Sequence, residues 1–141
     1  MYQKGKTYEE IEVGDSASFT KTITETDVYL YAGISGDFNP MHVDEEYAKT
    51  TQFGSRIAHG GLASSLLAPV LGMKLPGLGT VALSVEQKYR APTYFGDTIT
   101  CTVTVTKKIP KMKAVELKVE WKNQDGKMVS KGSCRALPPS A

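Results

Sequence analysis

Gly60-Gly-Leu-Ala-Ser-Ser-Leu-Leu-Ala-Pro-Val-Leu-Gly72 is the stretch that decides the fold of this 141-residue chain. It contains no charged side chain, and a helix that is apolar on every side is normally buried on every side. The sequence therefore predicts a buried helix over 60–72. Pro69 lies inside this helix, where its missing N–H predicts a kink or the last turn.

After this helix, apolar and polar residues alternate with a period of two, which predicts β-strands. The alternation covers Val81 to Tyr89, then 98–106, then 115–121. A turn is expected at 123–126 before a last strand over 127–137. Long antiparallel strands with one wet face would curl around the apolar helix to cover it. This predicts an α+β fold, a single hot-dog domain in which a curved antiparallel sheet wraps around a long central helix.

The chain before residue 60 predicts one strand and two helical segments. The stretch Ala17 to Thr24 is rich in Thr and Phe, which favours a strand. Thr24 can then cap a helix whose end is marked by Gly33 and Gly36. A further helical turn is expected over 44–50.

Composition describes an ordinary globular protein, with 40% hydrophobic and 23% charged residues. Since no repeat or linker divides the chain, we expect one domain over 1–137 and a disordered tail over 138–141. The net charge of +2 is scattered along the chain and does not indicate a nucleic-acid partner. Cys101 and Cys134 fall within predicted strands, where a buried thiol is a commoner explanation than a disulfide.

The N-terminal residues are charged and include no apolar run, so no signal peptide is expected. No stretch is long and apolar enough to predict a membrane span. These observations predict a cytoplasmic protein without a membrane partner.

Ser35-Gly-Asp-Phe-Asn-Pro-Met-His-Val-Asp44 is the first candidate for an active-site segment. Pro40 disfavours a regular helix, so Asp37 and His42 can meet only in a loop that folds back. If they converge on one water, a neutral His42 could act as base while the carboxylate aims the water. Asn39 could fix the loop through local hydrogen bonds. The alternative is a self-capping turn without catalytic work, because Asp, Asn and Pro are all turn formers.

Ile57-Ala-His-Gly-Gly61 is the second candidate segment, at the start of the predicted helix. Its glycines would let a ligand approach backbone N–H groups, where a helix N-terminus favours developing negative charge. A thioester carbonyl that becomes an enolate carries such a charge. Alternatively, the glycines serve a tight turn and close packing, and His59 is a hydrogen-bonded spacer.

Two other chemistries are not indicated by the sequence. The only histidines are His42 and His59, and their surroundings show no ligand spacing typical of a zinc or iron site. No Gly-x-Ser-x-Gly motif is present, and serines on an apolar helix, such as Ser64 and Ser65, usually bond back to the preceding turn. We therefore expect neither a metal site nor a serine hydrolase.

Three motifs together resemble the MaoC-like hydratases, a family that includes R-specific enoyl-CoA hydratases. They are Gly36-Asp-Phe-Asn-Pro-Met-His42, Ile57-Ala-His-Gly-Gly61, and Pro76-Gly-Leu-Gly79 before a strand. The resemblance extends from about Gly14 to Leu137. It implies a homodimer or larger homo-oligomer, in which one continuous sheet covers the two long helices.

The resemblance also implies residue roles. In that family the Asp and His of the loop hold the hydrating water, which implies Asp37 and His42. The amide of the glycine after the second His polarises the thioester carbonyl, which implies Gly60. Asn39 matches a residue that supports the loop, and Ser65 matches a serine that bonds near the catalytic pair.

His59 and Gly61 complete the expected supporting or substrate-binding residues. Gly61 and Ala63 stand where bulkier residues are frequent in the family, which leaves the depth of the acyl pocket open.

The activity implied is reversible syn addition of water to a trans-2-enoyl thioester, giving an (R)-3-hydroxyacyl product without a cofactor. The substrate carrier is coenzyme A or acyl carrier protein, so a 3-hydroxyacyl-acyl carrier protein dehydratase is one alternative. A hot-dog thioesterase is another, but it usually needs a carboxylate on the helix, and 60–72 contains none. A non-catalytic acyl-thioester-binding protein is the third, and it would not need the pair Asp37 and His42.

Overall fold

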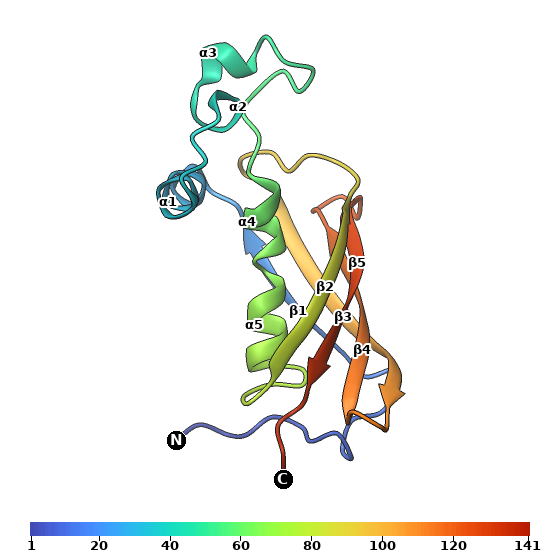
Figure 1. The fold of residues 1–141 in the computed structure, drawn as a ribbon. Coiled ribbons are helices and arrows are strands. Elements are labelled where there is room, and N and C mark those ends of the chain that lie inside the picture. The colour runs from blue at the N-terminus through green and yellow to red at the C-terminus, as the bar shows by residue number, and fades with distance from the viewer.

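An antiparallel sheet of five strands curves around a broken central helix in the computed structural model, which describes residues 1–141 (Figure 1). The strands are β1 (Ser16–Thr22), β2 (Val81–Tyr89), β3 (Thr98–Ile109), β4 (Ala114–Lys122) and β5 (Met128–Leu137). Their spatial order is β1-β3-β4-β5-β2, and every neighbouring pair is antiparallel. The predicted α+β arrangement is confirmed, and β2 forms one edge of the sheet.

The concave face of the sheet and the central helix bury one apolar core. Burial in β3 alternates residue by residue, because successive side chains of a strand point to opposite faces. The sheet contributes the buried residues Cys101, Val103, Val105, Leu117, Val119 and Trp121, and the helix contributes Leu66, Leu67, Val70 and Leu71. The two cysteines are free, and burial raises the pKa of Cys101 to about 12 and that of Cys134 to about 11. Both thiols therefore stay protonated at neutral pH.

The central helix is two helices rather than the one predicted over 60–72. They are α4 (Gly60–Ser64) and α5 (Leu67–Met73), so the break falls one turn before Pro69. Pro69 has no N–H to donate to the carbonyl of Ser65, and this carbonyl instead accepts from the N–H of Ala68 at 3.1 Å. The predicted kink is thus confirmed, and its position follows from the residue four places before the proline.

The expectation that this helix is buried on every side is wrong for the single chain. Ala68 and Met73 are exposed, although both are apolar. Strand β2 exposes apolar side chains as well, among them Val81, Leu83 and Val85. The helix face and the β2 edge therefore both expose apolar side chains in the single chain.

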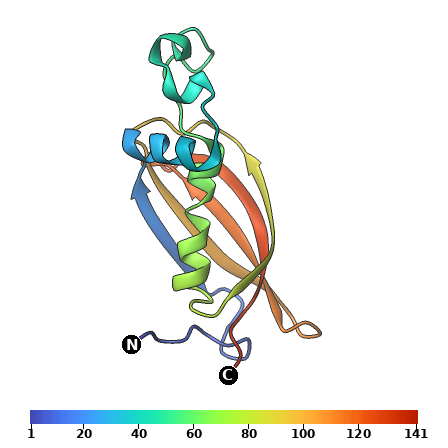
Figure 2. The same cartoon turned by 60° about the vertical axis from the view of Figure 1, so that its left-hand side comes forward.

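Helix α1 (Glu25–Ser35) begins as predicted, since Thr24 and Asp27 form a complete capping box. It ends at Gly36, whose φ of 80° lies in the left-handed region that favours glycine. Two short helices that the chain forms next, α2 (Pro40–Val43) and α3 (Glu45–Ala48), project beyond the end of the sheet (Figures 1 and 2). The turn expected over 44–50 corresponds to α3, whereas α2 was not predicted.

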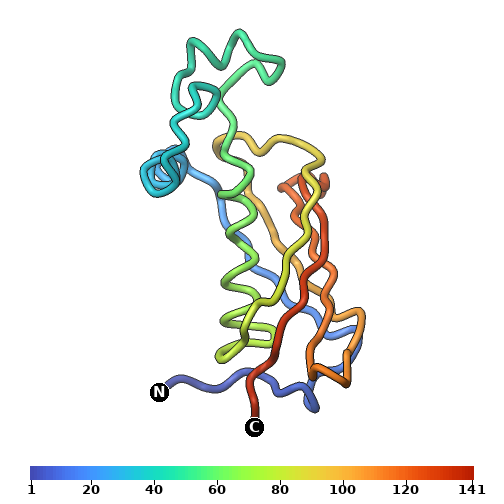
Figure 3. Tube along the Cα trace, viewed as in Figure 1, coloured from blue at the N-terminus to red at the C-terminus, as the bar shows by residue number.

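Both chain termini lie at the end of the molecule opposite α2 and α3 (Figure 3). Within the tail over 138–141, Pro139 is buried, with its Cβ 2.7 Å from where a Cβ on Gly79 would lie. Only Ser140 and Ala141 are exposed. None of the helices has the length and hydropathy required to cross a bilayer.

Candidate active site

The loop between α1 and α2 shapes itself through its own side chains. One oxygen of the Asp37 carboxylate, Oδ1, accepts from the N–H of Asn39 at 3.1 Å. Asn39 caps α2 by accepting from the N–H of Met41, also at 3.1 Å, and Pro40 occupies the first helical position. The self-capping turn is therefore real, and it leaves the second carboxylate oxygen, Oδ2, available for chemistry.

His42 is buried beneath this loop and holds one defined tautomer. Its Nδ1 lies 2.7 Å from the carbonyl oxygen of Ile57, so Nδ1 carries the proton and donates it. The unprotonated Nε2 lies 3.8 Å from Oδ2 of Asp37, a separation too long for a direct hydrogen bond. The two atoms can instead share one water, with Nε2 free to accept its proton. The structure thus brings the predicted pair together.

His59 links both members of this pair. It is only 2% exposed, and its Nε2 donates to the backbone carbonyl of Asp37 at 2.8 Å. Its ring stacks on that of His42 with centroids 3.9 Å apart. The hydrogen bond is consistent with the interpretation of His59 as a hydrogen-bonded spacer. The same side chain also holds the backbone of Asp37 and packs on the ring of His42.

The ligand atoms of Asp37, His42 and His59 lie within 4.8 Å of one another, which is close enough for all three to face one metal ion. A metal ion binds an imidazole nitrogen in the plane of the ring. One nitrogen of each ring is already engaged, since His42 Nδ1 lies 2.7 Å from the carbonyl of Ile57 and His59 Nε2 lies 2.8 Å from that of Asp37. This arrangement does not favour a metal centre.

Gly60 and Gly61 start α4 and are both in contact with aromatic rings. The N–H of Gly60 precedes the helix's own acceptors and donates to no backbone carbonyl. A Cβ on Gly60 would lie 2.7 Å from Cε1 of Tyr89, and a Cβ on Gly61 would lie 2.0 Å from Oη of Tyr31. Because α4 has only five residues, its dipole is small. The free N–H of Gly60 is therefore the main group that this position offers to a ligand.

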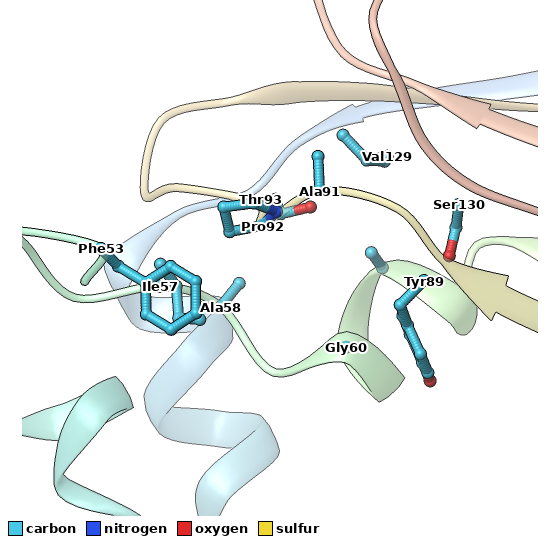
Figure 4. Close-up of a pocket in the computed structure, with 11 residues that line it drawn as sticks. Phe53, Ile57, Ala58, Gly60, Tyr89, Ala91, Pro92, Thr93, Val129 and Ser130 are labelled. Carbon is cyan, nitrogen blue, oxygen red and sulfur yellow. The ribbon is translucent and has the colours of Figure 1, made fainter. Parts of the chain in front are cut away.

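A pocket of about 230 Å³ opens behind Gly60. Figure 4 shows Phe53 and Ile57 on one side of it, Tyr89 and Gly60 on the other, and Val129 above them in this view. Most of its lining is hydrophobic, which suits an apolar chain. Ile57 joins this pocket to the candidate pair Asp37 and His42, because it lines the pocket while its carbonyl holds His42.

Ser65 makes no hydrogen bond to Asp37 or His42. Its side chain is exposed, and its hydroxyl donates to the carbonyl of Leu62 at 2.5 Å, which is the back-bonding expected from sequence. The neighbouring Ser64 donates to Oε1 of Gln87 at 2.6 Å, beside the pocket. Gln87 in turn donates to the buried hydroxyl of Ser130 at 2.8 Å, so a polar chain connects α4 to β2 and β5.

Sequence reasoning missed Tyr31 and Tyr89, the two aromatic residues that flank the glycines. Tyr89 is four residues after Val85 in β2, so both side chains lie on the same face of the strand, and Tyr89 pairs with the buried Ser130. This alternation was the one feature of the sequence that could have placed Tyr89 near the site. Nothing in the sequence pairs Tyr31 of α1 with Gly61, because the contact spans two separate elements.

Arg56 anchors the segment that carries the pair. Its Nε donates to Glu45 at 2.9 Å, its Nη1 donates to Glu25 at 3.1 Å, and its guanidinium lies 4.6 Å from the centroid of the Phe95 ring. Burial opposes the charge of Arg56, but the hydrogen bonds to Glu45 and Glu25 outweigh it and raise its pKa. The hydrogen bonds from Tyr29 and Arg56 lower the pKa of Glu25. These contacts tie α3 to α1.

Known proteins are similar to this chain over most of its length. The family model described as MaoC like domain matches residues 9–125. The chain is 45% identical to the (R)-specific enoyl-CoA hydratase of Rhodospirillum rubrum, over 94% of this chain and 92% of that protein. It is 41% identical to the 3-hydroxybutyryl-CoA dehydratase of Methylorubrum extorquens, over 78% and 70% of the two chains.

Solved structures with the same fold include the R-hydratase of Pseudomonas aeruginosa in its unliganded form. That match has a TM-score of 0.91 and 39% identity, and covers 97% of this chain and 88% of that one. The (R)-hydratase of A. caviae matches with a TM-score of 0.90 and 33% identity, over 93% and 99% of the two chains. This chain has their hot-dog fold and belongs to the MaoC-like domain family.

Proposed function

We propose that this protein is an R-specific enoyl-CoA hydratase. It adds water reversibly and with syn geometry to trans-2-enoyl-CoA, giving (R)-3-hydroxyacyl-CoA. The observation that carries the proposal is the pairing of Asp37 Oδ2 with the unprotonated Nε2 of His42, 3.8 Å apart and fixed by the loop and by Ile57. The match to relatives that bear this name supports it.

In the proposed reaction, Asp37 and His42 bind one water. His42 Nε2 takes a proton as the water oxygen forms its bond to C3, and the electrons of the C2=C3 bond move toward the thioester carbonyl. The Asp37 carboxylate aims the water and stabilises the imidazolium. A proton then returns to C2 from the pair, so the net change is one water added and no cofactor is consumed.

The thioester carbonyl oxygen gains negative charge while the enolate exists. The N–H of Gly60 makes no backbone hydrogen bond and is free to donate to this oxygen. A preorganised donor of this kind stabilises the transition state more than the ground state. The apolar pocket beyond Gly60 would hold the acyl chain, with Ala63 in its wall.

We also propose that two copies pair through the edge strand β2. Its backbone is hydrogen-bonded to β5 on one side only, and an unpaired edge invites another strand. A second copy would also cover the exposed Val81, Val85 and Met73. The cytoplasmic location remains a prediction from the sequence.

The test is incubation of the purified protein with crotonyl-CoA while the absorbance of the enoyl thioester is followed. We expect the absorbance to fall, with (R)-3-hydroxybutyryl-CoA as the product in a stereospecific dehydrogenase assay. Release of free coenzyme A without hydration would identify a thioesterase instead. Binding of the thioester without any turnover would identify a non-catalytic protein, and both outcomes contradict the proposal.

The carrier is tested by the same assay on crotonyl-acyl carrier protein. We expect a higher kcat/KM with the coenzyme A thioester, since the relatives at 45% and 41% identity are named for coenzyme A substrates. A clearly higher kcat/KM on the acyl carrier protein thioester would indicate a 3-hydroxyacyl-acyl carrier protein dehydratase instead.

A further inference from the structure

Tyr31 of α1 extends the stack of imidazoles at the candidate active site. Its ring centroid lies 4.8 Å from that of His59, at an interplanar angle of 50°, while His42 stacks on the same imidazole at 3.9 Å. We call His42, His59 and Tyr31 the ring column. The water-holding nitrogen of His42 is at one end of this column and the Tyr31 phenol is at the other.

The phenol of Tyr31 occupies the space that a side chain at position 61 would fill. A Cβ on Gly61 would lie 2.0 Å from Oη of Tyr31 and 3.0 Å from its Cζ. Any larger residue at position 61 would therefore push the phenol away. The absence of a side chain at Gly61 lets the hydroxyl lie against the first turn of α4, directly after Gly60.

The hydroxyl of Tyr31 has no hydrogen-bond partner within the chain, and the neighbouring N–H of Gly60 has no backbone acceptor. The hydroxyls of Tyr29 and Tyr94, in contrast, donate to Glu25 and to the carbonyl of Phe53. The first turn of α4 thus offers the N–H of Gly60, and the hydroxyl of Tyr31 lies against the next residue, Gly61. A pair of convergent donors is the arrangement that stabilises an oxyanion.

We propose that Tyr31 is a catalytic residue, whose hydroxyl donates a hydrogen bond to the thioester carbonyl oxygen together with the N–H of Gly60. The inference rests on the proposed hydratase function and adds a second donor to it. The position of the phenol favours the carbonyl over the attacking water, because the ring of His59 separates it from His42. Tyr31 keeps its proton throughout and forms no covalent bond.

The test compares Tyr31→Phe with the wild-type enzyme on crotonyl-CoA. This change removes one oxygen and keeps the ring against His59, so folding and melting temperature should be preserved. We expect kcat to fall about 100-fold with a much smaller change in KM, as for the loss of one oxyanion donor. Tyr47→Phe is the matched control, because Tyr47 on α3 is exposed and its hydroxyl makes no hydrogen bond within the chain.

Gly61→Ala provides a second, independent variant. In the wild-type background the new methyl displaces the phenol, so we expect kcat to fall toward the Tyr31→Phe value. Added to Tyr31→Phe, the same methyl meets no hydroxyl and only the ring carbon Cζ at 3.0 Å, so a small shift of the ring suffices and kcat should fall little further.

A folded Tyr31→Phe enzyme with wild-type kcat would overturn the inference alone, and the phenol would then only fill the space above Gly61. A wild-type protein that does not hydrate crotonyl-CoA would overturn the proposed function, and this inference with it. The two failures are therefore distinguishable.

Discussion

His59 donates from Nε2 to the backbone carbonyl of Asp37 at 2.8 Å while its ring lies 3.9 Å from that of His42. One buried side chain therefore fixes the backbone of the proposed water-orienting carboxylate and the plane of the proposed base. Because both contacts come from one rigid ring, a shift of His59 would move the two groups relative to each other.

The first prediction concerns the pair itself. Asp37→Asn and His42→Ala should each lower the turnover of crotonyl-CoA by several orders of magnitude, because both groups act on one water. The double variant should be little worse than either single one, since residues that work as a unit are not additive. Circular dichroism provides the folding control. A folded single variant with near-normal turnover would show that another group activates the water.

The second prediction concerns His59 as a positioning residue. His59→Leu removes the hydrogen bond to the Asp37 carbonyl and the aromatic stack, and a misplaced catalytic group can cost about 10²-fold in rate. We expect kcat to fall by about that factor, with a smaller change in KM. His59→Gln can still donate to the carbonyl and should recover part of kcat. Equal losses in both variants would show that the hydrogen bond does not matter, and a melting curve separates this effect from unfolding.

The sequence was most informative where local chemistry determines structure. The alternation in 98–106 and 115–121 and the N-cap at Thr24 depend on neighbours in the chain, and both predictions were confirmed. The expectation that Pro40 disfavours a helix was wrong, because Pro40 occupies the first position of α2, where its missing N–H costs nothing. The break between α4 and α5 was predicted as a kink or last turn at Pro69, and it falls earlier in the chain because the carbonyl that Pro69 leaves without its N–H is that of Ser65.

Contacts between distant elements could not be predicted in this way. Tyr31 meets Gly61, and Tyr89 meets Gly60, only after α1 and β2 have packed around α4. The hydrogen bond from His42 to Ile57 similarly joins two motifs that are adjacent in space and 15 residues apart in sequence. The resemblance to a family assigned Gly60 a role, but the aromatic walls around it come from tertiary packing.

The third prediction tests the pairing of two copies. Val85 lies in the middle of β2 with its side chain 54% exposed, so Val85→Lys would place a charge in the proposed interface. We expect the wild-type protein to sediment as a dimer at micromolar concentration and the variant to shift toward monomer. Met112→Lys is the matched control, because Met112 is similarly exposed but lies in the turn between β3 and β4. A wild-type protein that stays monomeric contradicts the proposed pairing.

The last prediction concerns the N–H of Gly60, and two substitutions separate its role from the space in front of it. Gly60→Ala keeps the donor but places a methyl group 2.7 Å from Cε1 of Tyr89. Because Tyr89 is 62% exposed, its ring can move, and the loss should be mainly in KM. Gly60→Pro adds the same carbon and also removes the donor.

The backbone is suited to this proline. His59 has φ −60° and ψ 138°, in the extended region that residues before proline adopt, and position 60 is the first residue of α4. We therefore expect a folded Gly60→Pro enzyme whose kcat is far below that of Gly60→Ala, since the loss of one oxyanion donor costs about 3–4 kcal/mol of transition-state stabilisation. Steady-state kinetics on crotonyl-CoA measure the difference, with circular dichroism as the folding control. Equal kcat values for the two folded variants would mean that the N–H of Gly60 does not hold the carbonyl, and the Tyr31 hydroxyl would then have to act without it.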